Sequence, residues 1–102
     1  MAKGDEMPSE GLPGQAQVEA ALLRFMTVKS RPITPSEAYR GLADVFSLTR
    51  EQRERQLLTE PRSEWENLVR FAKRRLVDRG LVTTPKRSIW ELTPLGKMEL
   101  TI

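Results

Sequence analysis

Apolar residues recur at helical spacing in the first half of the chain and predict two helices. Between residues 15 and 29 one apolar stripe is formed by Val18, Leu22, Phe25 and Met26, and this spacing is typical of one helix face. The pair Arg31 and Pro32 ends the pattern. Thr34 then suits an N-cap, because Pro35 and Glu37 follow at the positions of a helix start and a capping box. The apolar face of this second helix consists of Ala38, Leu42, Val45 and Phe46.

A polar helix and an amphipathic helix are predicted next. Residues 50–56 are nearly all polar, so a short helix that begins after Thr49 should be exposed. Ser63 and Glu66 have the spacing of a capping box for a long helix that runs to Arg79, where Gly80 suits the C-terminal cap. One side of this helix carries Trp65, Leu68, Val69, Ala72 and Leu76, and the other carries Asn67, Arg70 and Arg74, with Lys73 on a flank.

The pattern changes from helical to extended after Gly80. Residues 81–83 and 89–92 predict two short strands, joined by a turn over residues 84–88. Thr93 and Pro94 predict the start of a final helix that extends to about Leu100. The fold class expected is therefore mainly α with a small β-hairpin, a winged helix-turn-helix. Its core should contain Leu22, Leu42, Trp65, Leu68, Ala72, Leu76 and Trp90, with Tyr39 and Phe71 in or near it.

Composition limits the domain organisation and the chemistry. Residues 1–14, rich in glycine and proline, are expected to be a disordered tail, and residues 15–102 one domain. No apolar run is long enough to span a membrane and no signal peptide is evident, so a cytoplasmic protein is expected. The 102 residues include no cysteine and no histidine, which excludes thiolate metal sites and histidine acid–base chemistry. Without any catalytic motif, we expect no enzyme activity, no cofactor and no metal.

Positive charge is concentrated in the second half of the chain. The net charge is +3, yet residues 62–90 hold eight basic residues against three acidic ones. Such a cluster favours a phosphate-rich partner. A helix that enters the major groove would place Asn67 and Arg70 at base edges and Arg74 at a phosphate. The complete set of expected DNA-binding residues is Arg62, Ser63, Asn67, Arg70, Lys73, Arg74, Lys86 and Arg87.

The C-terminal half also resembles a known family. Residues 65–82 (WENLVRFAKRRLVDRGLV), residues 85–96 (PKRSIWELTPLG) and the upstream residues 48–53 (LTREQR) are similar to the N-terminal domain of Mrr-type restriction system proteins. The resemblance covers the chain from about Val18 to Leu100. It implies a winged-helix fold that binds double-stranded DNA and directs a nuclease domain or subunit to it, often to modified DNA. The nuclease domain is absent from this sequence.

Three alternatives stay open from the residues alone. The same fold also serves as a protein-interaction or dimerisation module. RNA is another partner that a basic face would suit. Finally, a basic helix face is often only a solvated surface, and Glu66 with Arg70 has the spacing of a helix-stabilising ion pair.

Overall fold

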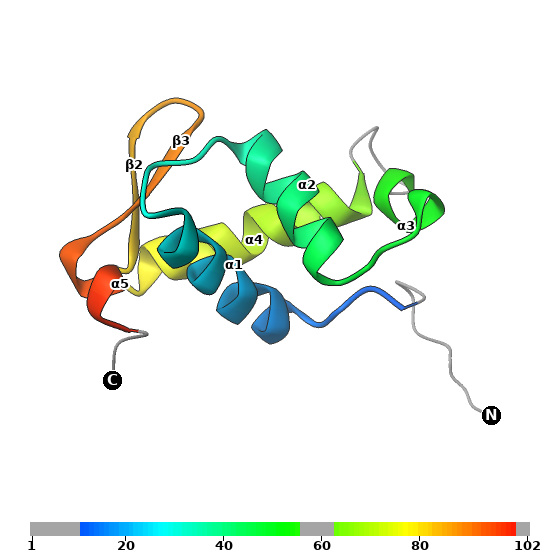
Figure 1. The fold of residues 1–102 in the computed structure, drawn as a ribbon, viewed down its shortest axis with the longest axis horizontal. Coiled ribbons are helices and arrows are strands. Elements are labelled where there is room, and N and C mark those ends of the chain that lie inside the picture. Colours follow the sequence, from blue (N-terminus) through cyan, green and yellow to red (C-terminus); the bar gives the residue numbers. More distant parts are fainter. Residues whose placement is uncertain (1–10, 56–62, 100–102) are drawn as a thin grey trace.

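The computed structural model describes residues 11–55 and 63–99. The elements, in order, are α1 (Gln15–Lys29), α2 (Pro35–Val45), α3 (Arg50–Glu54), α4 (Glu64–Asp78), β2 (Val82–Lys86), β3 (Ile89–Leu92) and α5 (Pro94–Glu99). Figure 1 shows α1 crossing in front of α4, with the hairpin and α3 at opposite ends of the molecule. The predicted class, mainly α with one antiparallel hairpin, is confirmed and is consistent with a winged-helix-like fold.

Some predictions fall on residues outside this description. They concern residues 1–10 of the expected tail, the polar helix beyond residue 55, Arg62, and the chain after residue 99. Within the tail region Leu12 is buried and belongs to the core cluster, so packing begins before α1. No helix in the described part of the chain is long and apolar enough to cross a bilayer.

The predicted helix starts are confirmed, with one correction. Thr34 Oγ1 accepts a hydrogen bond from the Glu37 N–H at 3.2 Å, and the Glu37 carboxylate accepts one from the Thr34 N–H at 3.0 Å. At the start of α4 only half of the expected capping box forms, because the Glu66 carboxylate does not accept a hydrogen bond from the Ser63 N–H. The Ser63 hydroxyl accepts from the Glu66 N–H at 3.2 Å and donates to the Arg53 carbonyl at 3.1 Å. Ser63 therefore fastens the start of α4 to α3.

Gly80 ends α4 as predicted and turns the chain into the hairpin. Its φ of 78° lies in the left-handed region, where glycine is favoured. The Gly80 N–H donates to the Val77 carbonyl and the Leu81 N–H to the Leu76 carbonyl, both at 2.9 Å. This pair of bonds is a Schellman motif, which satisfies carbonyls that the helix leaves open.

The core forms where α1, α2, α4 and the hairpin meet. Of the seven residues predicted for it, six are buried: Leu22, Leu42, Trp65, Ala72, Leu76 and Trp90. Leu68 is only partly buried, at the edge of the cluster. The predictions for Val45 and Phe71 were wrong, since their exposed fractions are 60% and 55%. Val45 ends α2 and the following turn brings Leu48 into the core instead, while Phe71 points away from the buried stripe of α4.

The hairpin differs from the prediction in the length of its first strand and of its turn. Residues 84–86, which were expected in the turn, continue strand β2, and only Arg87 and Ser88 form the turn. Thr83 pairs with Glu91 and Lys86 with Ile89, so β2 has one extra residue between these pairs. Pro85 lies in this irregularity, where its missing N–H removes no ladder bond. The β2–β3 hairpin, which we call the wing, is therefore longer than predicted, and its tip is formed by Arg87 and Ser88.

A third extended segment pairs with the hairpin and was not predicted. Ile33, between α1 and α2, forms an isolated antiparallel bridge with Trp90. The Ile33 N–H donates to the Trp90 carbonyl at 2.9 Å, and the Trp90 N–H donates to the Ile33 carbonyl at 2.8 Å. The bridge fixes β3 beside the start of α2.

Truncation of Leu76 tests the packing of α4. Its side chain has no exposed surface, so Leu76→Ala should lower the free energy of unfolding by about 2–5 kcal/mol. Urea denaturation followed by circular dichroism measures this loss. A change within experimental error would contradict the assignment of this helix face to the core.

Candidate nucleic-acid interface

The structure brings three predicted DNA-binding residues together between α4 and the wing. Arg70 and Lys73 of α4 and Arg87 of the hairpin turn line a hollow of about 410 Å³. The other lining residues are Pro35, Tyr39, Ser88 and Trp90. We call this site the wing–helix hollow. It unites cations that come from two separate elements.

Trp90 sets the geometry of this hollow. Its backbone is held by Ile33, and its ring meets Tyr39 of α2 edge-on, with centroids 6.3 Å apart. The Nζ atom of Lys73 lies 5.6 Å from the centroid of the Trp90 ring. A cation over an indole face is attracted by the negative face of the ring. Trp90 therefore links α2, α4 and the wing, and its ring positions the ammonium group of Lys73.

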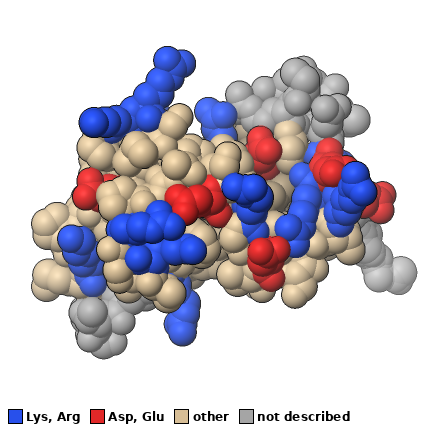
Figure 2. Space-filling view, turned by 45° about the horizontal axis from the view of Figure 1, so that its top comes forward, with Lys and Arg blue, Asp and Glu red and all other residues tan. Residues whose placement is uncertain are grey.

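Ion pairs divide the basic residues of α4, its C-terminal cap and the wing into two groups. On the side of α1, Arg75 and Arg79 lie 4.0 and 3.6 Å from the carboxylate of Glu19, and Arg79 also approaches Glu99 of α5 at 3.7 Å. On the wing side, Arg70, Lys73, Lys86 and Arg87 make no ion pair with any residue that the structure describes. In Figure 2 many of the basic side chains in view lie beside acidic ones. Positive charge without a counter-charge thus remains at the wing–helix hollow.

The pKa of Lys73 lies below its ordinary value. Burial lowers the pKa first, and the neighbouring charges of Arg70 and Arg74 lower it further. Both causes disfavour the protonated amine. An anion in the hollow would offset the repulsion and raise the pKa of Lys73 again.

The other predicted contacts occupy different positions. Asn67 and Arg74 lie on the outer face of α4, where Arg74 Nε approaches the carboxylate of Asp78 at 3.4 Å. Lys86 ends β2 and is exposed. Ser63 is the N-cap, and its hydroxyl already makes two hydrogen bonds. Glu66 makes no ion pair with Arg70 within the described residues, so the simple helix-stabilising couple is absent there.

Two residues beside the hollow were not identified as candidates from the sequence. Arg40 of α2 lines a smaller hollow of about 110 Å³ with Glu66 and with Tyr39, which also borders the wing–helix hollow. The sequence pattern places Arg40 on the polar face of α2, but it does not predict the contact between α2 and α4. Phe71 is exposed four residues after Asn67 and three before Arg74. That spacing already put Phe71 on the face of those polar residues, against the expectation of burial.

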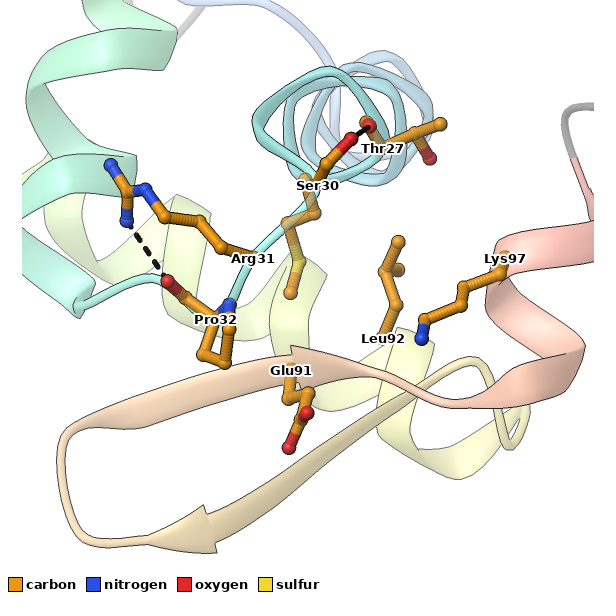
Figure 3. Close-up of a pocket in the computed structure, with 8 residues that line it drawn as sticks. Thr27, Ser30, Arg31, Pro32, Glu91, Leu92 and Lys97 are labelled. Carbon is orange, nitrogen blue, oxygen red and sulfur yellow. Dashed lines mark hydrogen bonds between the residues drawn. The ribbon is translucent and has the colours of Figure 1, made fainter.

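A different hollow, of about 450 Å³, lies between the end of α1, β3 and α5. Figure 3 shows its lining residues, in which Arg31 donates to the Pro32 carbonyl at 2.9 Å. Arg31 also forms an ion pair with Glu37 at 2.6 Å. This ion pair, together with the hydrogen bond from the Thr34 N–H, lowers the pKa of Glu37 to about 2. The positive charge of Arg31 is therefore already compensated by Glu37. No group of three potential metal ligands occurs among the described residues.

Comparison with known proteins identifies the family. The profile of the Mrr N-terminal domain matches residues 16–101. The chain belongs to this family. No curated protein and no solved structure matches it significantly. The resemblance noted in residues 65–96 is thereby confirmed, and the match spans α1 to α5 of this Mrr N-terminal domain.

Proposed function

We propose that this Mrr N-terminal domain binds double-stranded DNA, with α4 in the major groove and the wing at the neighbouring backbone. The observation that carries the proposal is the convergence of Arg70, Lys73 and Arg87, from two elements, around one hollow. Phosphate contacts supply most of the affinity in such complexes because they release counterions. Three cations without an acidic partner in the described chain suit that task.

The roles within the interface follow from position. Asn67 is partly exposed near the start of α4, so we propose it for a base edge, where an amide pairs with adenine. Arg70 was expected at a base as well, but its place beside Lys73 and Arg87 favours a phosphate. Arg74 contacts a phosphate once its ion pair with Asp78 is broken. This costs little, since an exposed ion pair of this kind contributes only about 0–1 kcal/mol to stability. Lys86 and Arg87 extend the contact along the wing.

The family membership supports a targeting role for the domain. In this proposal the domain brings a nuclease domain or subunit to DNA and performs no chemistry itself. Its interface binds the backbone without a cofactor.

Removal of the wing-tip cation tests DNA binding directly. Arg87→Ala should weaken binding to two unrelated duplexes equally, by about eightfold near 0.1 M salt, because each lost phosphate contact removes ~0.9 from the slope of log K against log salt. Fluorescence anisotropy at several salt concentrations measures both quantities. Arg24→Ala, which removes an exposed cation from α1, is the matched control and should change neither beyond a small net-charge effect.

Three results would oppose the proposal. Arg87→Ala and Arg24→Ala with equal slopes would mean that the wing is only a solvated surface. Wild-type protein that binds no duplex, yet self-associates in sedimentation experiments, would favour the interaction-module interpretation. A preference for duplex RNA over duplex DNA in a competition experiment would make RNA the partner instead of DNA.

A further inference from the structure

The outer face of α4 carries an apolar side chain among polar and basic ones. Phe71 is exposed over 55% of its surface, although α4 buries other apolar residues on its opposite side. With Asn67, Arg70, Lys73 and Arg74 it lines a hollow of about 200 Å³ on the helix. Nothing in the described chain covers the ring fully, and no aromatic or cationic contact of Phe71 is present among the described residues.

Position along the helix places Phe71 at one edge of the proposed groove-facing surface, where the ring also borders a second hollow, of about 340 Å³, with residues 12–15. Asn67, Phe71 and Arg74 are spaced by four and three residues, so their side chains share one face of α4. Trp65, Val69 and Leu76 occupy the opposite, buried face. A major groove that receives α4 would therefore meet the phenyl ring between an amide and a guanidinium.

The chemistry of the groove indicates what this ring contacts. Base edges in the major groove are hydrogen-bonding groups, with one apolar exception, the C5-methyl group of thymine. The cations around Phe71 favour a polyanionic partner over an apolar protein surface. We propose that Phe71 is a specificity-determining residue that contacts a thymine methyl group. This inference rests on the proposed binding of double-stranded DNA.

Deoxyuridine provides the sharpest test, because it removes the methyl group and leaves base pairing unchanged. The probes are a 16-base-pair duplex of alternating A·T pairs and the same duplex with every thymine replaced by uracil. We expect wild-type protein to bind the thymine duplex about fourfold more tightly for one buried methyl group. Phe71→Ala should bind both duplexes equally and keep the salt slope, and Phe71→Leu should retain part of the preference.

Each outcome decides between the inference and its alternatives. Equal affinity of wild type for both duplexes, or an undiminished preference in Phe71→Ala, overturns the role of Phe71 while DNA binding stands. Absence of salt-dependent binding overturns the proposed function and the inference with it. A change of oligomeric state in Phe71→Ala, measured by sedimentation without any change in the thymine preference, would assign the ring to a protein interface instead. Circular dichroism of both variants establishes that they are folded.

Discussion

Replacing Trp65 by alanine is expected to lower the free energy of unfolding by about 3–5 kcal/mol. The side chain lies in the first turn of α4 and is 1% exposed. Its Nε1 donates to the Tyr39 carbonyl at 2.8 Å, and its ring meets Phe46 edge-on at 6.1 Å. The substitution removes the contact that holds α2 against α4 and leaves a cavity. A domain of this size has a total stability of about 5–15 kcal/mol, so a large part would be lost.

Trp65→Phe separates packing from hydrogen bonding. It keeps an aromatic ring and removes the indole donor, so the expected loss is about 1–2 kcal/mol. Urea denaturation monitored by circular dichroism measures both variants, since loss of a tryptophan complicates fluorescence. If Trp65→Ala costs no more than Trp65→Phe, the ring contributes little to the contact of α2 with α4 and the core assignment is wrong.

Local signals in the sequence predicted the helices well. Thr34 with Glu37 and Thr49 with Gln52 form complete capping boxes in the structure, because each bond joins residues only three apart. Gly80 likewise ends α4 through bonds to residues just before it. The error at Val45 has a different cause. Periodicity alone gave the apolar face of α2, but the end of the helix decided which residue, Leu48, entered the core.

Non-local contacts were beyond the sequence pattern. The bridge of Ile33 with Trp90 joins residues far apart in the chain, and a single β-branched residue between a proline and a helix cap gives no strand periodicity. Pro85 predicted a turn, since proline is disfavoured within strands, but the irregularity in β2 accommodates it. The wing length therefore depended on pairing that only the folded chain provides.

The candidate site shows the same division. The charge count over residues 62–90 indicated a basic surface, and the helical wheel placed Arg70 and Lys73 outside the core. Neither could reveal that Glu19 and Glu99, from α1 and α5, neutralise Arg75 and Arg79. Those pairs decide which cations of α4 keep an uncompensated charge, and the cations that remain lie on the wing side.

Removal of all three cations of the wing–helix hollow should have the largest effect on binding. If each one neutralises a phosphate, the variant with Arg70→Ala, Lys73→Ala and Arg87→Ala loses ~2.7 from the salt slope, and its affinity near 0.1 M salt falls by about 500-fold. The charges on α1 and α5 give a matched control, in which Arg24→Ala, Lys29→Ala and Lys97→Ala remove the same net charge from exposed positions.

Anisotropy titrations of both triple variants on one duplex, from low to physiological salt, separate local contact from net charge. If binding depends only on the total charge of the protein, both variants should lose the same affinity for DNA. Direct contact affects only the variant in the hollow, because counterions are released where a cation reaches a phosphate. Lys73 also packs over Trp90, so circular dichroism and urea denaturation must show that the hollow variant is folded. Equal slopes for the two folded variants would remove the wing–helix hollow from the DNA interface.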